Sequence, residues 1–248
     1  MLGPPFFLEP PMQLNTSTRA LLFSALLASS PLALGAAQPP AASSIFRNPQ
    51  AASMADALAR GDSNAAMLGI ARKVDPNTSG LAGIRPIHYV VSYADDLSLA
   101  SLRALIGAGA DVNAKMDNGS TPLGLAAERA TADALGILLG SRANPKLESH
   151  GRLPIQIAMA GGHRKSFELL AMAGSPLSGP SYATGSAAQD LARTGKNDWL
   201  LWMAQRGLVA SGSLPQTFWS DICSSSDPSA AAVAKVLSTQ PRALGCKR

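Results

Sequence analysis

Short apolar stripes at helical spacing recur along the chain, separated by polar breaks rich in glycine and proline. The clearest stripe follows Thr121-Pro122, where Leu123, Ala126 and Ala127 are spaced three and four residues apart. A Thr hydroxyl can cap a helix and a Pro fits its first turn, so a helix is predicted to begin here. A second is predicted over about 132–140, where leucines share one face. Both are too short to be stable alone, because isolated helices under roughly 12 to 15 residues are marginal in water.

The opening phrase and the apolar segment behind it recur. TPLG at 121–124 aligns with RPIH at 85–88, with LPIQ at 153–156 and more weakly with AAQD at 187–190, at spacings of 36, 32 and 34 residues. A second apolar segment follows each of the first three at a similar offset: 102–115, 135–147 and 167–176. Segments 55–77 and 214–237 look like degenerate terminal copies. Such units bury their apolar faces only by stacking, which predicts a solenoid.

This pattern resembles the ankyrin-repeat family over about residues 50–238. The resemblance rests on the period near ~33 residues and on GSTPL at 119–123, GADVN at 109–113 and GGH at 161–163. It implies an all-α fold, an ankyrin-repeat solenoid of about five to six helix-turn-helix units with short hairpin loops. Composition agrees, since 46% hydrophobic but only 5% aromatic residues favour closely packed short helices over a sandwich or barrel.

Several positions depart from the family pattern. The departures are Arg85, Leu153 and Ala187 at the position of the capping Thr, and Gly124 and Gln156 at the position of the His that is kept at His88. Arg142 follows a helix where a Gly is usual, so it is expected to adopt a left-handed conformation at some energetic cost. The unit of 36 residues is expected to carry a short insertion around 95–97.

The N-terminal segment has the plan of an export signal. Residues 12–37 run from a polar start with Arg19 through an apolar stretch at 20–28 to the small residues at 35–37. This predicts a signal peptide over 1–37, cleaved after Gly35 or Ala37, with Met12 as an alternative start. A membrane anchor is disfavoured because the run falls short of roughly 18 to 20 unbroken apolar residues. The protein is therefore expected in a bacterial-type periplasm or secreted.

The rest of the chain divides by composition into a linker, a repeat domain and a tail. Residues 38–50 are expected to form a flexible linker, 51–238 the ankyrin-repeat domain and 239–248 a C-terminal tail. The two cysteines, Cys223 and Cys246, favour a disulfide in an oxidising compartment that ties the tail to the last unit. Two free thiols are the alternative.

No group of residues has the spacing of a catalytic or metal site. His88 and His163 occupy repeat positions where a structural role is expected, and His150 at a hairpin tip is either a solvated loop residue or a partner contact. No second His or Cys stands at zinc-ligand spacing near His150. Asp95-Asp96 reads as a solvated loop, and the stripe of Trp199, Trp202 and Met203 as core. We therefore expect no enzyme activity, no cofactor and no metal.

Charge argues against a nucleic-acid partner. The net charge is +5 and the basic residues are scattered without a concentrated face. The resemblance implies instead a monomeric protein that binds another protein through the concave face, as an inhibitor, an immunity factor or an accessory to stress defence. The candidate contacts are the hairpin-tip residues Asp117, Asn118, Ser120, Ser149, His150, Arg152, Tyr182 and Thr184, and the helix-end residues Tyr93, Glu128, Arg129 and Arg193. Tyr and Arg among them are the expected anchors.

An alternative function belongs to a different class. A small ligand or a reaction could be served by a site near the C-terminal unit, where Trp219, Asp221 and Cys223 lie close in sequence. Convergence of these side chains on one pocket would favour it. The sequence leaves the identity of a partner open.

Overall fold

The structure is a computed structural model, and it describes residues 41–92, 98–129, 131–180, 182–209, 214–239 and 246. The chain divides into two compact units, Met1–Pro40 and Ala41–Arg248. All that follows concerns the second unit.

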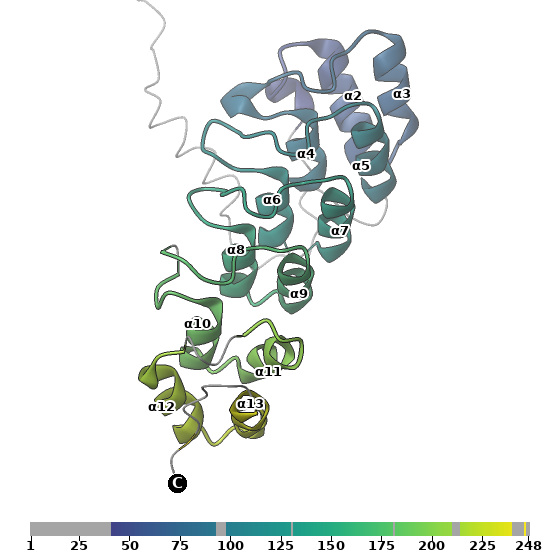
Figure 1. Cartoon of the computed structure of the whole chain (residues 1–248). Helices are drawn as coiled ribbons and strands as arrows, with labels where there is room; N and C mark the ends of the chain where they lie inside the picture. The colour runs from purple at the N-terminus through teal and green to yellow at the C-terminus, as the bar shows by residue number, and fades with distance from the viewer. Residues whose placement is uncertain are drawn as a thin grey trace, which may run out of the picture. The chain divides into compact units, whose positions relative to one another are not determined.

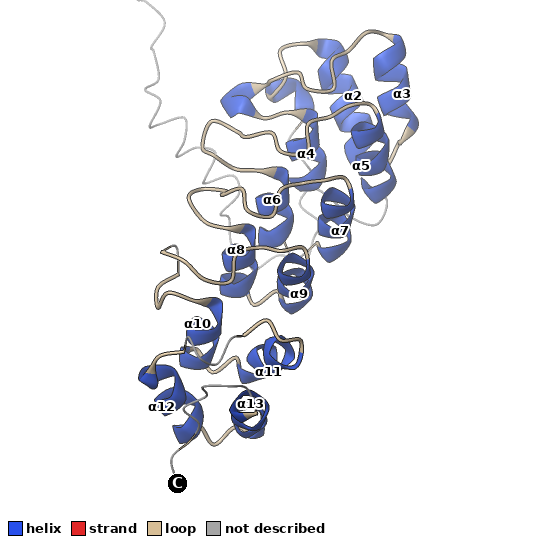
Figure 2. Cartoon of the chain, in the orientation of Figure 1, coloured by secondary structure: helices blue, strands red, loops and turns tan. Residues whose placement is uncertain are grey.

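Within the described residues the secondary structure is helical, with isolated β-bridges only (Figure 2). The α-helices are α2 (Pro49–Ala59), α3 (Asn64–Ala71), α4 (Pro86–Ser92), α5 (Ser98–Gly107), α6 (Pro122–Glu128), α7 (Ala132–Gly140), α8 (Pro154–Gly161), α9 (Arg164–Met172), α10 (Ala187–Arg193), α11 (Asn197–Gln205), α12 (Gln216–Ser224) and α13 (Pro228–Ser238). Two 3-10 turns accompany them, η1 (Ala42–Ser44) and η2 (Leu81–Gly83).

The helices pair into six consecutive helix-turn-helix units that stack in two layers. The first helix of each unit, α2, α4, α6, α8, α10 or α12, packs against the second helix of the same unit. Figure 1 shows α4, α6, α8 and α10 in one layer and α5, α7, α9 and α11 in the other, with the longer loops projecting from the first layer. The predicted all-α ankyrin-repeat solenoid is confirmed.

Helices α6 and α10 begin with a capping hydroxyl, and in α10 the cap lies one residue before the predicted position. The Thr121 hydroxyl accepts a hydrogen bond from the Gly124 N–H at 3.1 Å, and Pro122 is the first residue of α6. In the fifth unit the cap is Ser186, whose hydroxyl accepts from the Gln189 N–H at 3.3 Å. The alignment of Ala187 with Thr121 was therefore one residue late. Because α10 lacks the Pro that begins α4, α6 and α8, no residue marks the register of the alignment there.

The folded unit begins earlier than the sequence predicted. Residues 41–50 were expected to be a flexible linker, yet η1 and the start of α2 lie within them. Ile45 and Phe46 are buried, and the Ala42 N–H donates to the Asp56 carboxylate of α2 at 2.9 Å. The Pro- and Ser-rich composition suggested a linker, although Ile45 and Phe46 pack into the folded unit.

Aromatic side chains join the fourth unit to the fifth. Phe167 of α9 is fully buried, and its ring lies 5.1 Å from that of Trp199 and 6.3 Å from that of Trp202, centroid to centroid. Arg164 of α9 forms an ion pair with Asp198 of α11 across the same junction. The prediction that Trp199, Trp202 and Met203 form core is confirmed, because all three are buried.

None of the described helices has both the length and the apolar character needed to cross a bilayer.

Candidate partner-binding surface

The hairpin loops are held to one another by a ladder of asparagine side chains. The Asn77 amide donates to the Gly109 carbonyl at 3.0 Å and accepts from the Asp111 N–H at 2.8 Å. One unit further, Asn113 accepts from the Asn144 N–H at 2.8 Å. Each bond ties a loop to the next one in the stack, so the loops have fixed relative positions.

The ladder ends at the fourth unit. There the Ser175 hydroxyl, in place of an asparagine, donates to the Pro145 carbonyl at 3.0 Å. The predicted left-handed conformation of Arg142, which borders this ladder, is confirmed by its φ of 68°.

The backbone N–H of the residue before α4, α6 and α8 is satisfied by a different side chain in each unit. The Arg85 N–H donates to Nδ1 of His88 at 3.0 Å, and the Leu153 N–H donates to Oε1 of Gln156 at 2.9 Å. In the third unit Gly124 offers no side chain, and the Thr121 N–H donates instead to the Ser149 hydroxyl from the following hairpin at 3.1 Å. The His kept at position 88 and two departures from the family pattern thus satisfy one structural requirement.

His88 is a neutral structural histidine, as predicted. Its Nδ1 accepts a hydrogen bond, so Nε2 carries the proton and donates to the Ala114 carbonyl at 3.0 Å. Burial disfavours the charged ring and lowers the pKa of His88 to about 4, with the nearby Arg85 cation acting in the same direction and the bond to the Ala114 carbonyl opposing it. His88 is thus a poor general base near neutral pH.

The turn between the two helices of a unit binds the previous unit. His163 donates from Nε2 to the Glu128 carbonyl at the end of α6, 3.0 Å away, which confirms its structural role. In the next unit Lys196 stands at the matching turn and its ammonium donates to the Met159 carbonyl. Sequence reasoning missed Lys196, although Gly195-Lys196 aligns with Gly162-His163 and could have revealed it.

Four of the predicted contact residues are exposed on neighbouring hairpin tips. They are Asp117, Asn118, His150 and Arg152. The His150 N–H donates to the Gly119 carbonyl at 3.4 Å, which brings the second tip against the first. His150 has a φ of 53°, unusual for a residue with a side chain, and its Nε2 is hydrogen bonded to the Ser120 hydroxyl. We refer to these four residues as the tip group.

The helix-end residues form a separate set. Glu128, Arg129 and Arg193 are exposed, but they lie at the C-terminal ends of α6 and α10. A helix of seven residues, such as α6, is about 10 Å long. The tip group and the helix-end group therefore lie at opposite ends of the first-layer helices, and they do not form one cluster.

The structure corrects the placement of four predicted contact residues. Ser120, Ser149 and Tyr182 are buried, and Thr184 is half-buried. Ser149 satisfies the Thr121 N–H, Tyr182 donates to the Pro176 carbonyl at 2.6 Å, and Thr184 donates to the Asp190 carboxylate at 2.8 Å. Burial, and secondarily the Asp190 charge, raises the pKa of Tyr182. The position of these residues in loops suggested that they are exposed, but their side chains point into the protein and bond to it.

Two expectations fall outside the described residues. Tyr93, a candidate contact, and the insertion around Asp95, Asp96 and Leu97 both lie in the segment 93–97, which the structure does not describe.

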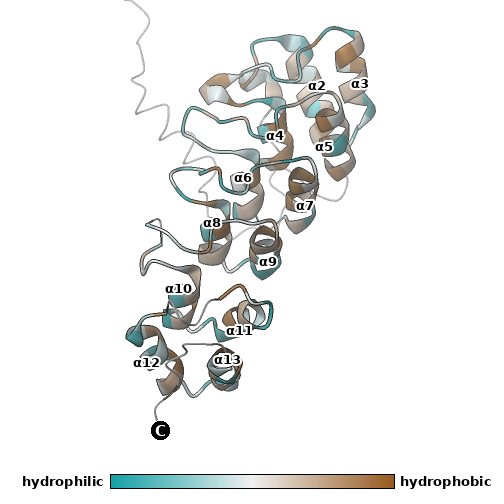
Figure 3. Ribbon diagram, in the orientation of Figure 1, coloured by the Kyte–Doolittle hydropathy of each residue, from teal (hydrophilic) through white to brown (hydrophobic). Residues whose placement is uncertain are grey.

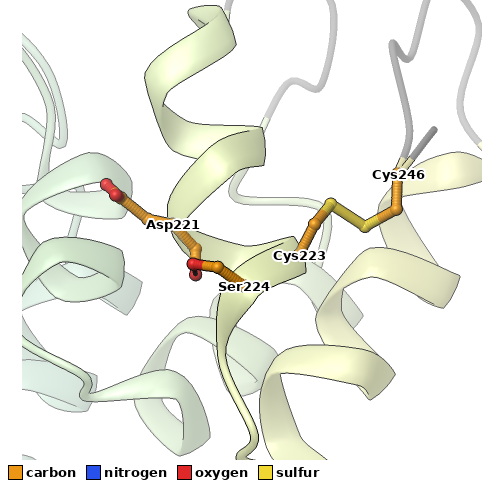
Figure 4. Close-up of a disulfide and its surroundings, with 4 residues drawn as sticks. All are labelled: Asp221, Cys223, Ser224 and Cys246. Atoms are coloured by element: carbon orange, nitrogen blue, oxygen red, sulfur yellow. Dashed lines mark hydrogen bonds between the residues drawn. A yellow bond between two sulfur atoms is a disulfide. The ribbon is translucent and has the colours of Figure 1, made fainter. Parts of the chain in front are cut away.

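The alternative site near the C-terminal unit does not converge. Trp219 is buried, whereas Asp221 and Cys223 are exposed. In Figure 4 the Asp221 carboxylate points away from Cys223, on the other side of α12. The sulfur atoms of Cys223 and Cys246 lie at bonding distance with their Cα atoms 5.6 Å apart, so Cys223 faces the tail rather than a pocket.

Two hollows of the described surface lie on the helices α2, α3, α5, α7 and α9 rather than at the hairpin tips. An open groove of about 800 Å³ runs along the second-layer helices α5, α7 and α9, with Ile106, Ile137 and Leu169 among its walls. The described residues contain no group of three or more His, Cys, Asp or Glu side chains that could hold a metal ion.

Comparison with known proteins supports the fold. A family model for ankyrin repeats, in three copies, matches residues 87–178. The crystal structure of the human ASB11 ankyrin repeat domain is similar with a TM-score of 0.57 and 23% sequence identity, covering 74% of this chain and 82% of that one. No curated protein matches the sequence significantly.

Proposed function

Because a family model for ankyrin repeats matches residues 87–178, and because such repeats are general protein-interaction modules, we propose that the protein is a non-enzymatic binding protein whose partner contacts the hairpin tips. The observation that carries the proposal is the tip group, Asp117, Asn118, His150 and Arg152. These four side chains are exposed on two adjacent tips that backbone and side-chain hydrogen bonds hold in place.

The chemistry of the tip group suits recognition of a polar protein surface. It offers one carboxylate, one guanidinium, one amide and one imidazole. Because the loops are fixed before binding, little loop-ordering entropy is lost on association. Among the described residues no nucleophile, base and orienting group come together with open access, which supports a non-enzymatic role: the Ser120 hydroxyl bonded to His150 is buried.

We further propose that the protein acts after export, as a monomer. The three-part segment at 12–37 supports cleavage near Ala37, and the folded unit begins soon after, at Ala41. The Cys223 and Cys246 geometry supports a disulfide, which an oxidising compartment would maintain. In such a setting the partner would be an exported toxin, an exported enzyme or a component of stress defence.

Affinity capture from the exported fraction tests the binding surface. The test variant is Asp117→Ala with Arg152→Ala, and the helix-end variant is Glu128→Ala with Arg193→Ala. The control variant is Asp133→Ala with Lys165→Ala, which removes the same two charges from the second layer. Loss of a captured protein in the test variant alone supports the proposal. Capture that is unchanged in the test variant, or lost only in the helix-end variant, refutes it.

Export and the disulfide have separate tests. Fractionation followed by mass measurement of the purified protein should give a chain that starts near Gln38. Thiol counting under denaturing conditions should find none before reduction and two after it. A full-length chain in the cytoplasm would overturn the export proposal without affecting the proposed binding surface.

A further inference from the structure

In α3, the second helix of the first unit, the small residues are buried and the large apolar residues are exposed. In α3 the buried residues are Ala65, Ala66 and Gly69, which pack toward α2. A Cβ on Gly69 would collide with the sulfur of Met54, so the contact with α2 requires this small face. Met67 and Ile70 therefore lie on the other side of α3, and Leu68 lies at its edge, where it lines a hollow next to α2.

That other side is apolar and uncovered. Met67 is 70% exposed, Leu68 53% and Ile70 49%, and Leu81 of η2 is 49% exposed. In the part of the chain that the structure describes, Met172 is the one other large hydrophobic residue with comparable exposure. Figure 3 shows α3 in hydrophobic colours at the edge of the stack. Terminal units of solenoids usually have polar outer faces, so an apolar one indicates a contact surface.

Cations flank this face at both ends of α3. Arg60 precedes the helix, and Arg72 and Lys73 follow its last turn. All three are exposed, and none forms an ion pair with another described residue. Arg72 lies one turn beyond Leu68, and both line a small hollow between α2 and α3 together with Asp62.

The acidic residues nearby are engaged in local turns. The Asp62 carboxylate accepts a hydrogen bond from the Asn64 N–H at 3.0 Å, and the Asp75 carboxylate accepts from the Asn77 N–H at 2.8 Å. The three cations Arg60, Arg72 and Lys73 outnumber these two carboxylates, so the ends of α3 carry a net positive charge. A second copy of this chain on the same face would bring like charges together, which disfavours self-association.

We propose that the exposed α3 face docks on an anionic lipid surface. Met67, Leu68 and Ile70 enter the boundary between head groups and acyl chains, while Arg60, Arg72 and Lys73 face the lipid phosphates. An apolar helix face flanked by cations is the arrangement that interfacial helices use. This surface is distinct from the tip group, so the proposal stands apart from the proposed protein-binding function.

Vesicle co-sedimentation of the full chain tests the proposal. The vesicles are phosphatidylcholine alone, or an equimolar mixture of phosphatidylcholine and phosphatidylglycerol. The chain should bind the anionic vesicles more tightly. Arg72→Gln with Lys73→Gln should weaken that binding by about fivefold for each cation removed. Met67→Gln with Ile70→Gln should weaken it on both kinds of vesicle.

Matched controls separate this face from the rest of the molecule. Met172→Gln removes an exposed methionine from α9, and Arg103→Gln with Lys165→Gln removes two exposed cations from the second layer. The N-terminal segment is common to every variant and contributes equally. The proposal is supported if only the α3 variants lose binding and vesicles slow hydrogen exchange in α3. It is overturned if the α3 variants and the controls bind alike, or if the α3 variants abolish self-association or binding of a protein instead.

Discussion

Replacing His88 with Gln should remove a pH dependence of stability while preserving the helix opening. His88 accepts the Arg85 N–H in α4, and Gln156 accepts the Leu153 N–H at the equivalent position of α8. A Gln at 88 can therefore supply the same acceptor without a titrating group. It loses the hydrogen bond from His88 to the Ala114 carbonyl, which should cost about 1 kcal/mol at neutral pH.

The size of the effect follows from the shift in pKa. Burial lowers the pKa of His88 from 6.5 to about 4 in the folded protein, and the unfolded chain keeps the higher value. Between these values the unfolded state binds the proton and the folded state does not. The stabilisation is thus fully present above pH 6.5 and is lost as the pH falls toward 4. The change amounts to about 3 kcal/mol of unfolding free energy.

Urea unfolding of wild type and His88→Gln across this pH window measures the difference. Carboxylates that titrate at low pH affect both proteins equally, so the difference isolates His88. The reciprocal variant, Gln156→His, should gain a pH dependence of the same sign in α8. Parallel stability curves for wild type and His88→Gln between pH 6.5 and 4 would refute the reasoning, because His88 would then titrate alike in both states.

Four further substitutions have defined outcomes in denaturant unfolding. Gly124→Ala should destabilise the folded protein by about 1 to 3 kcal/mol, because the new Cβ would collide with Ser149. Gly136→Ala should stabilise it by up to about 1 kcal/mol, because nothing lies within 4 Å of the new methyl group. Equal effects would contradict this packing. Arg142→Gly should stabilise by roughly 1 kcal/mol by relieving the left-handed φ of 68°, and a loss of stability would show that the arginine side chain contributes more than its backbone costs. Phe167→Ala should lower the free energy of unfolding by about 3 to 5 kcal/mol. It should also make hydrogen exchange faster in α10 to α13 than in α4 to α7. Equal exchange rates in the two groups of helices would show that this ring does not hold the junction.

The repeat architecture could be predicted because its signals are local. A capping hydroxyl, a proline in the first turn and a stripe of small apolar residues lie within a few positions of each other, as at Thr121-Pro122. The same locality explains the successful prediction for Arg142, since a helix followed by a loop without glycine leaves few conformations open.

Exposure within the loops could not be predicted, because it depends on contacts between units. Ser149 is buried only because Gly124, from the previous unit, leaves room for it and leaves the Thr121 N–H without another acceptor. Tyr182 is buried because its loop closes on the Pro176 carbonyl. Neither requirement can be read from the repeat itself. The alignment identifies loop positions, and only the stack distinguishes those that face solvent.

The limits of the repeat pattern coincide with a change in how the units are joined. The family match ends at residue 178, and the asparagine ladder ends at Ser175, its last bond. Beyond this point the fourth and fifth units are joined by long side chains, Phe167 against Trp199 and Lys196 to the Met159 carbonyl, rather than by closely packed small residues. A junction of large side chains satisfies the same need for burial without the small-residue motif by which repeats are recognised. The repeat fold therefore continues through α13 beyond the residues that the family model matches.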